Sequence, residues 1–465
     1  MTLLGNYQSV TEIVLEPRID TGPIPLTAMQ CMPWQFLQEG KLCARTLPFA
    51  LRICGSLDIE ALKVSLRTIL DRHESLRMRI SSIDGVISQH AVAPDEYYLK
   101  TVDITEEFKF GGEGLARTHI QAFVDHKVSQ SCDPLFEAKL FKLSDDEHIL
   151  AISIDHLITD GVSNEILRRE LWILYKQTVD GLFTSLPKMS LQFADYAAWL
   201  QKIYPIWIRT HGMYWRERLA SAGRIRWPAE CAGVEQRPAR FSSLDIPFGA
   251  HLTAELRSFA RRERTVPAVV MLSLYLAVVA RLCGQTDLTL AFVEHGRHRI
   301  ELSRMIGLLA THLHLRLQVT KAQSFLDLVS HAARELNSAS QHRDFDWAPS
   351  LVPEFKPALN FHWQPTMSTG AMSLFNDPSR THNSIRIKLY PIEPCMEVLP
   401  DFVECLPYDL MLLVSSTAAQ LTATVVYRDN LFSLSTVERF ARNLRLFSEF
   451  FIHRPLACVG SVSMD

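Results

Sequence analysis

Apolar and polar positions along the chain follow two periods, which predict a mixture of helices and strands. In segment 57–70 apolar residues recur every three or four positions, which predicts an amphipathic helix with Ser56 as its cap. Segment 421–427 alternates apolar and polar residues, as a half-exposed strand does. Segment 266–280 is apolar on all sides but shorter than the roughly 20 residues that span a bilayer, so it predicts a buried helix.

A β-hairpin is expected in the first half of the chain. Segments 132–140 and 148–154 are strand-like, and the acidic stretch 144–147 between them suits a turn. Further helices are expected at 25–30 (with Thr27 as a cap), 164–177, 194–200, 253–262 and 435–451, and further strands at 49–53, 78–80, 243–246 and 288–293. The chain is therefore expected to have an α/β fold.

The order of these elements indicates two similar lobes. Helix, strand, helix, strand in the first half is followed by the same order after a Pro- and Gly-bearing stretch. We expect an N-terminal lobe at 1–222, a linker at 223–240 and a C-terminal lobe at 241–465. Nine of the 23 prolines fall in 349–407, which predicts loops and edge strands that act as a crossover or latch around 345–410.

Composition narrows the class of protein. A formal net charge of −3 gives no reason to expect nucleic acid or an anionic membrane as a partner. The nine cysteines form no C-x-x-C pair, so free thiols in a reducing cytoplasm are expected, with no metal site. The N-terminus lacks the pattern of a signal peptide. We expect a cytoplasmic monomer.

The strongest candidate for chemistry is the segment 151–161. An apolar strand-like run ends in Asp155 and His156, and Asp160 and Gly161 follow four residues later. A histidine at a strand end can act as a base on a rigid scaffold. Taken alone, the same pattern is more typical of a histidine that is satisfied inside a core.

Six degenerate motifs occur in the order that one family shows. Besides 155–161, they are Pro25-Leu26-Thr27-Ala28-Met29-Gln30-Cys31-Met32-Pro33-Trp34, Arg72-His73-Glu74-Ser75-Leu76-Arg77, Phe193-Ala194-Asp195-Tyr196-Ala197-Ala198-Trp199, Ile306 to Arg316, and Tyr427-Arg428-Asp429-Asn430-Leu431-Phe432. Together they resemble the condensation domains of nonribosomal peptide synthetases, within the chloramphenicol-acetyltransferase-like superfamily. The resemblance covers the chain from about Ile24 to its end. It implies two acetyltransferase-like lobes in a V-shaped pseudo-dimer with the active-site tunnel between them.

The family signature HHxxxDG reads Asp155-His156-Leu157-Ile158-Thr159-Asp160-Gly161 here, so Asp155 replaces the first histidine. The resemblance implies that His156 deprotonates or orients the acceptor amine, and that Gly161 suits a tight turn and a close approach of substrate. Asp160 is expected to be buried and paired with an arginine, Arg77 in preference to Arg72. Ser163 is expected to support the site.

Two departures from the family pattern affect the expected site. If Asp155 pointed toward His156, its carboxylate would favour the charged imidazole and weaken the base. Strand alternation favours the other arrangement, in which the two side chains point apart. In the second lobe Thr311 and His312 stand where the family has Asn-Thr, and they are the expected substrate-binding residues.

The resemblance implies an acyltransferase of nonribosomal peptide and antibiotic biosynthesis. It would pass an acyl or aminoacyl group from the 4'-phosphopantetheine thioester of an acyl or peptidyl carrier protein to an amine, forming an amide or an ester, with no cofactor of its own. Two alternatives stay open: an inactive condensation-like domain that recruits a carrier or a tailoring enzyme, and an acyltransferase that uses acyl-coenzyme A. The chain starts at Met1 and carries no recognisable adenylation or carrier segment, so a free-standing enzyme or an excised domain is expected.

Overall fold

The chain folds into two compact units. The computed structural model describes residues 13–20, 22–38, 46–83, 85–94, 98–124, 134–182, 186–228, 231, 241–343, 352, 355–365, 385–391, 408–417 and 419–464. The first unit comprises Met1–Pro205, His295–Ala310 and Ser368–Glu397, and the second comprises Ile206–Glu294, Thr311–Met367 and Val398–Asp465. Most of the expected linker and much of the 345–410 stretch lie outside the described residues.

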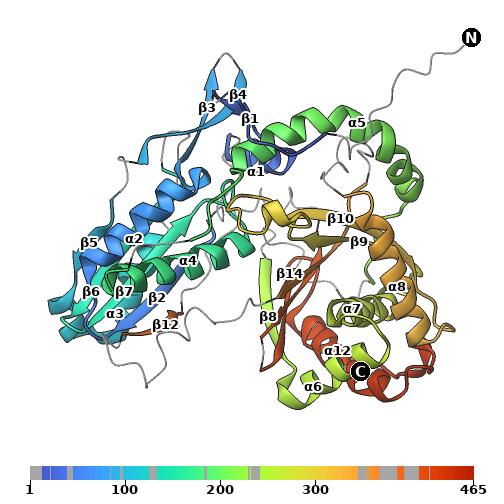
Figure 1. Cartoon of the computed structure of the whole chain (residues 1–465). Helices are drawn as coiled ribbons and strands as arrows, with labels where there is room; N and C mark the ends of the chain where they lie inside the picture. The colour runs from blue at the N-terminus through green and yellow to red at the C-terminus, as the bar shows by residue number, and fades with distance from the viewer. Residues whose placement is uncertain are drawn as a thin grey trace, which may run out of the picture. The chain divides into compact units, whose positions relative to one another are not determined.

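The first unit is built on a five-stranded sheet with the strand order β12-β2-β7-β6-β5 (Figure 1). Its strands are β2 (Phe49–Cys54), β5 (Lys100–Asp103), β6 (Phe136–Ser144), β7 (Glu147–Ile154) and β12 (Arg386–Tyr390). Helices α2 (Ile59–Arg72) and α4 (Gly161–Val179) cover one face, and α3 (Thr105–Val124) covers the other. Ile152 and Ile154 pack with α2 and α4, while Ile149 and Ala151 pack with α3. Burial on both faces explains why β7 is an almost continuous apolar run.

Helices α1, α2 and α4 each begin directly after a residue whose side chain accepts a hydrogen bond from a backbone N–H of the first turn. Asp58 caps α2 by accepting from Ala61 N at 2.9 Å, so the predicted cap Ser56 is wrong by two residues. Thr27 is confirmed as the cap of α1 (Ala28–Gln38), since its hydroxyl accepts from Gln30 N at 3.3 Å. Helix α4 begins three residues earlier than predicted, because Asp160 caps it.

The predicted hairpin is confirmed as β6 and β7, which pair antiparallel. The turn itself is Asp145 and Asp146, since β6 reaches Ser144 and β7 starts at Glu147. Lys142 lies opposite His148 in this pair.

The second unit holds a six-stranded sheet with the strand order β10-β9-β11-β13-β14-β8. Its strands are β8 (Phe241–Pro247), β9 (Asp287–Glu294), β10 (Thr311–Gln318), β11 (Leu359–Pro365), β13 (Leu410–Ser416) and β14 (Leu421–Arg428), and its helices are α6 (Gly249–Arg262), α7 (Pro267–Cys283), α8 (Phe325–Ser340) and α12 (Leu434–His453). Helix α7 is the predicted buried helix, and it ends at Gly284, whose φ of 68° is left-handed.

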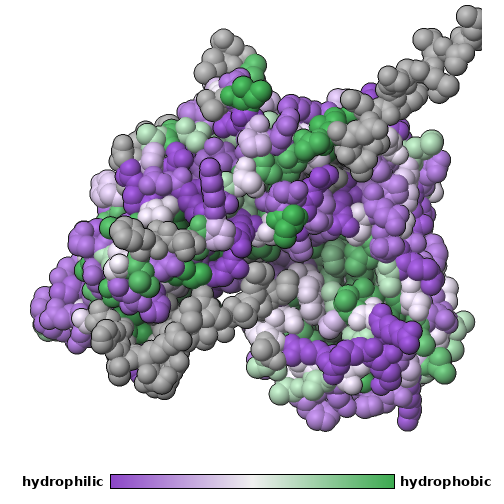
Figure 2. Space-filling view, in the orientation of Figure 1, coloured by the Kyte–Doolittle hydropathy of each residue, from purple (hydrophilic) through white to green (hydrophobic). Residues whose placement is uncertain are grey.

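Smaller elements complete the two units. A three-stranded sheet of order β1-β4-β3 is formed by β1 (Ile24–Pro25), β4 (Val86–Ala91) and β3 (Met78–Ile83), and the 3₁₀ helices are η2 (Glu74–Arg77), η5 (Ile300–Leu302) and η6 (Val459–Ser461). Figure 2 shows hydrophobic surface at the tip of the β3–β4 hairpin, where Val86 is 66% exposed. Helix α5 (Phe193–Leu219) continues from the first unit into the second at Pro205.

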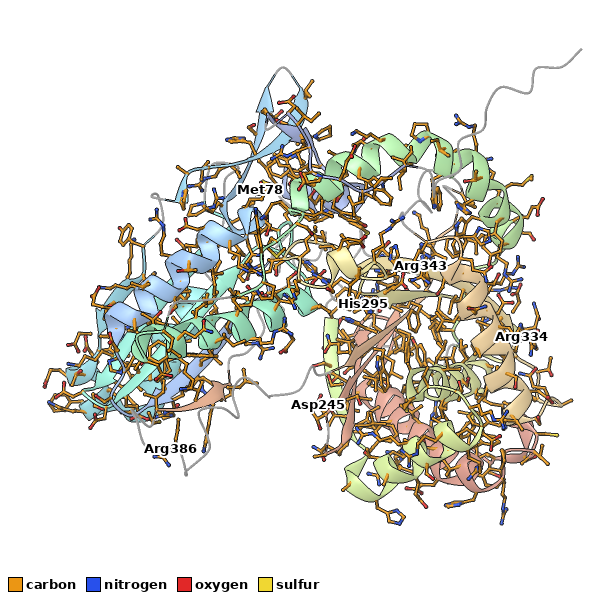
Figure 3. All side chains as sticks on the ribbon, in the orientation of Figure 1. Met78, Asp245, His295, Arg334, Arg343 and Arg386 are labelled. Atoms are coloured by element: carbon orange, nitrogen blue, oxygen red, sulfur yellow. The ribbon has the colours of Figure 1, made fainter. Side chains whose placement is uncertain are left out.

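The two compact units do not correspond to the first and second halves of the sequence. Residues 295–310 lie between β9 and β10 in sequence but pack with the first unit, and so does β12. β12 pairs antiparallel with β2 and forms an edge of the first sheet, where Figure 3 labels Arg386 at its start. Within the described residues no single helix is long and apolar enough to cross a bilayer. Helices α6 and α7, which are bent by 106° relative to each other, would together have the length and composition of a span.

Candidate active site

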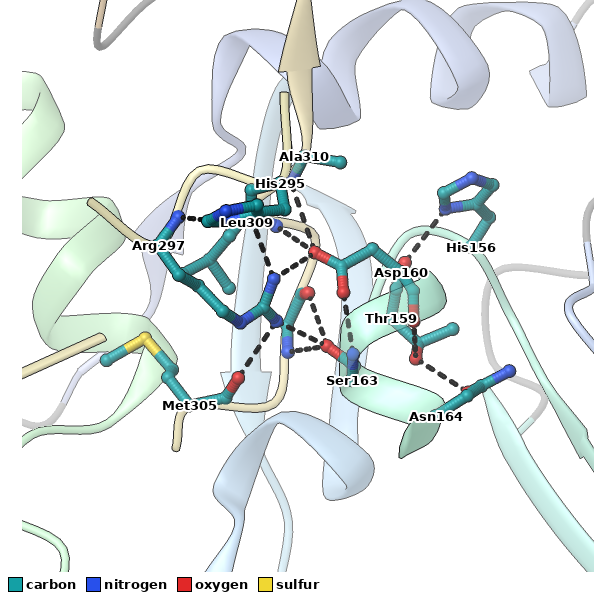
Figure 4. Close-up of polar contacts among 11 residues, drawn as sticks. His156, Thr159, Asp160, Ser163, Asn164, His295, Arg297, Met305, Leu309 and Ala310 are labelled. Atoms are coloured by element: carbon teal, nitrogen blue, oxygen red, sulfur yellow. Dashed lines mark hydrogen bonds and ion pairs between the residues drawn. The ribbon is translucent and has the colours of Figure 1, made fainter. Parts of the chain in front are cut away.

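His156 lies just beyond the end of β7, on the loop that leads into α4. Its side chain is half-buried, and Nδ1 lies 2.8 Å from the carbonyl oxygen of Thr159 (Figure 4). A carbonyl oxygen can only accept a hydrogen bond, so Nδ1 carries the proton and donates it. In the neutral ring Nε2 is then left with a free lone pair, which is the form a general base needs.

Asp155 is fully buried, unlike its neighbour His156. Its Oδ1 accepts the N–H of Leu157 at 2.8 Å, and its backbone forms a bridge with Thr46. The carboxylate thus stabilises the turn that follows β7. The hydrogen bonds from Leu157 N to Asp155 and from His156 to Thr159 O involve different backbone groups, and the expected arrangement in which the two side chains point apart stays a prediction.

Asp160 is paired with Arg297, and the predicted partners Arg77 and Arg72 are wrong. Arg297 Nη1 lies 2.8 Å from Asp160 Oδ2, and both side chains are only 3% exposed. The same oxygen accepts the N–H groups of Leu309 and Ala310 at 3.0 and 3.1 Å, and Oδ1 accepts that of Ser163 at 2.8 Å. Burial alone would raise the pKa of Asp160, but the Arg297 charge and the hydrogen bonds from Arg297 and Ser163 outweigh it and hold the pKa below its ordinary value.

The two arginines of the Arg72–Arg77 motif bind elsewhere in the first unit. Arg77 donates to the carbonyl oxygens of Leu70, at 2.7 Å, and Val92. Arg72 donates to the buried carboxylate of Glu170 at 2.9 Å. Each of these arginines therefore has its own hydrogen-bond acceptors. The carboxylate of Asp160, at the start of α4, is instead paired with Arg297 of the segment 295–310.

Ser163 connects the first turn of α4 to the segment 295–310. Its hydroxyl donates to Gly307 O at 2.9 Å, and accepts from Gly307 N at 3.1 Å and Arg297 Nη2 at 2.8 Å. The expected supporting role of Ser163 therefore has a structural basis in these three hydrogen bonds.

Two glycines allow the segment 295–310 to close around this network. Gly296 has a left-handed φ of 68°, and a Cβ there would come within 1.8 Å of Leu309 O. At Gly307 a Cβ would lie 2.2 Å from the ring of Phe193. A side chain at either position would displace the backbone that contacts Asp160 and Ser163.

Gly161 is the first residue of α4, and its φ is not left-handed, so its backbone conformation is open to other residues. A Cβ added at Gly161 would meet nothing within 4 Å. The glycine thus leaves open space beside the start of α4, which suits a close approach of substrate.

The second-lobe candidates lie on β10. Thr311 is 8% exposed, and His312 is half-buried with its ring centroid 6.1 Å from that of Tyr408. His312 and His314 alternate on one face of the strand, and their ring centroids are 6.3 Å apart. In the described part of the chain no group of three or more His, Cys, Asp or Glu side chains is arranged to hold a metal ion. Substrate binding by Thr311 and His312 stays a prediction.

Sequence reasoning missed Arg297, which follows a buried strand and a glycine. It also missed His295, whose Nδ1 accepts the N–H of Arg297 at 3.0 Å. Partial desolvation and the Arg297 charge lower the pKa of His295. The signal that could have found Arg297 is the requirement of a buried carboxylate for a cation.

A comparison with protein-family models matches residues 21–464 to the family described as Condensation domain. Among curated proteins, chondramide synthase cmdD of Chondromyces crocatus is 27% identical over 95% of this chain. Malpibaldin synthetase of Mortierella alpina is 27% identical over 91% of it. The chain spans only 11% and 8% of the length of these two relatives.

Solved structures share the fold. The X-domain from teicoplanin biosynthesis has a TM-score of 0.78 and 22% sequence identity, and the match covers 97% of this chain and 100% of that one. The condensation domain of the Monacolin K polyketide synthase MokA has a TM-score of 0.77 and 16% identity, with 94% and 99% of the two chains covered. The two-lobed, chloramphenicol-acetyltransferase-like fold expected from the sequence is thereby confirmed.

Proposed function

Because the chain belongs to the condensation-domain family of nonribosomal peptide synthesis, we propose that it is an acyltransferase with His156 as its base. The donor is an acyl or aminoacyl thioester on the 4'-phosphopantetheine arm of a carrier protein, and the acceptor is an amine. The observation that carries this proposal is the hydrogen bond from His156 Nδ1 to Thr159 O, which leaves Nε2 free to accept a proton.

The proposed reaction uses His156 first as a base and then as an acid. The acceptor nitrogen attacks the thioester carbonyl carbon, and its proton passes to Nε2 of His156. The C–N bond forms, the C–S bond breaks, and the proton is returned to the departing thiolate, so the imidazole ends the cycle neutral. An alcohol acceptor would give an ester by the same steps.

Asp160 and Gly161 contribute through structure. Asp160 accepts four hydrogen bonds, one of them from Arg297, so its role is to fix the start of α4 and not to exchange protons. Gly161 keeps open the space beside that helix start. Both therefore support the segment that carries His156.

The test is a condensation assay with carrier-loaded donors and a panel of amines. We expect His156→Ala to lose roughly 10²- to 10⁴-fold in rate, which is the usual contribution of a positioned base. His251→Ala is the matched control, because the side chain of His251 is 89% exposed on α6 and should leave the rate unchanged. Equal rates for wild type and His156→Ala would remove His156 from the reaction. Repeating the assay with acyl-coenzyme A shows whether the protein uses a carrier-protein thioester or a coenzyme A thioester as its donor.

A second candidate is a domain that binds a partner without turnover. It is favoured by Asp155, which replaces a histidine of the family signature, and by the fold shared with the X-domain of teicoplanin biosynthesis, which has also been solved in a complex with OxyB. Carrier binding without product from any amine would support this candidate over acyl transfer.

A further inference from the structure

Three hydrogen bonds link His156 to Leu47, which precedes β2, and Figure 4 draws the two between His156, Thr159 and Asn164. His156 Nδ1 lies 2.8 Å from Thr159 O, and Thr159 Oγ1 lies 3.1 Å from Asn164 Oδ1. Asn164 Nδ2 in turn donates to Leu47 O at 3.1 Å. The side chain of Asn164 thus joins the histidine loop to the chain that leads into β2.

The proton positions along this series can be assigned from which atoms are able to donate. Leu47 O can only accept, so the amide group of Asn164 must present its NH₂ to it and its oxygen to Thr159. The hydroxyl of Thr159 then donates to Asn164 Oδ1 at 3.1 Å, which is nearer than its other acceptor, Asp160 O at 3.4 Å. Thr159 is fully buried, which holds its carbonyl oxygen in place as the acceptor of His156 Nδ1–H.

Backbone hydrogen bonds hold both Leu47, which accepts from the Asn164 side chain, and the backbone of Asn164 itself. Leu47 N donates to Ile154 O at 2.8 Å at the end of β7. Asn164 lies in the first turn of α4, and its N–H bonds to Asp160 O at 3.1 Å. The amide of Asn164 therefore holds Thr159 between two rigid elements.

We propose that Asn164 is a positioning residue for acyl transfer, which acts through Thr159 to hold His156 in the tautomer with a bare Nε2. This inference rests on the proposed function for its kinetic consequence, but the tautomer is a property of the free protein. A base whose ring turns or changes tautomer loses rate without losing substrate affinity.

The kinetic test compares variants at both links. We expect Asn164→Ala and Thr159→Val each to lower kcat about 10- to 100-fold with little change in KM. Asn164→Asp keeps the acceptor for Thr159 but lacks the donor to Leu47, so it should fall between wild type and Asn164→Ala. Thr159→Ser retains the hydroxyl and should recover most of the activity that Thr159→Val loses. Thr159→Val combined with Asn164→Ala should be no worse than either alone, since both break one series of contacts.

The structural test uses ¹⁵N NMR of protein labelled at histidine, with the His156 signals assigned by their loss in His156→Ala. Wild type should show a protonated Nδ1 and a bare Nε2 at His156, and Asn164→Ala should show a mixture of tautomers. Lys176→Ala, in the last turn of α4 where this side chain is 36% exposed, should leave the spectrum and kcat unchanged. Thermal unfolding is recorded for every variant to compare only folded proteins.

The outcomes separate the two proposals. A wild-type tautomer in Asn164→Ala would overturn the role of Asn164, whether or not kcat changes. An altered tautomer with no acyl transfer by wild type with any donor would refute the proposed function while the positioning by Asn164 stands.

Discussion

At the scale of single residues, the ion pair between Asp160 and Arg297 organises the candidate site. The pair is almost completely buried, and each partner also binds backbone groups of the segment 295–310 or of α4. Breaking such a pair leaves a buried charge without its partner. The segment that carries His156 is therefore held by electrostatics as well as by packing.

We expect Arg297→Met to lower the free energy of unfolding of the protein by about 3–5 kcal/mol, because Asp160 is left buried and unpaired. Urea unfolding at neutral pH measures this. Asp160→Asn added to Arg297→Met should recover part of the lost free energy of unfolding, since it removes the buried negative charge that no longer has a partner. Asp145→Asn, at a carboxylate that is 94% exposed, serves as the control. Equal stability of Arg297→Met and wild type would show that the pair does not stabilise the fold.

A second expectation concerns the departure from the family signature. Asp155→Asn keeps an oxygen that can accept the N–H of Leu157, and removes the charge. Because this carboxylate accepts the N–H of Leu157 in its own turn, we expect the pH profile of kcat/KM to superimpose on that of wild type. A shift of the acidic limb would instead show that Asp155 acts electrostatically on His156.

At the scale of elements, periodicity predicted the structures whose stabilising contacts are local. The apolar spacing of 57–70 and the hairpin 132–154 depend on neighbours in sequence, and both were confirmed as α2 and β6–β7. Helix α3 was missed because Gly111, Gly112 and Gly114 interrupt its pattern, and Gly112 has a non-helical φ of 55°. In the same way, Arg297 could not be assigned to Asp160, because no local pattern states which distant arginine completes a buried pair.

β12 was foreseen only as an unspecified edge strand, since its partner β2 lies in the first part of the chain. Ile387 in β12 is 1% exposed and belongs to the core between the sheet and helices α2 and α4. We expect Ile387→Ala to lower the free energy of unfolding by about 2–5 kcal/mol through the cavity that it leaves. Leu389→Ala, two residues on and 57% exposed, is the matched control and should have little effect. A similar loss in both variants would argue against a packed β12.

At the scale of the whole molecule, each unit contains a histidine that resists protonation. Burial lowers the pKa of His148 in β7, with a smaller contribution from Lys142. Desolvation and the neighbouring His211, whose Nδ1 is 2.8 Å from Nδ1 of His342, lower the pKa of His342, which also stacks on Tyr214 with 3.8 Å between ring centroids. Both units should therefore be sensitive to mild acid.

Because the folded-state pKa of these histidines lies below the unfolded value of about 6.5, the unfolded chain binds more protons as the pH falls. The free energy of unfolding should thus decrease between about pH 7.5 and 5.5. Urea midpoints at several pH values measure the slope. His148→Gln and His342→Gln should each flatten it, and His251→Gln should not. A slope that is the same in all three variants would assign the acid sensitivity to other groups.

The place of the segment 295–310 in the first unit has a consequence for the design of chimaeric proteins. It belongs to the compact body of the first unit, although it is encoded between two strands of the second. A chimaera that exchanges only the N-terminal half would bring a new Asp160 and Ser163 to an Arg297 and Gly307 from another parent. The two halves are thus not interchangeable modules, and a viable exchange must carry residues 295–310 along with the half that contains His156.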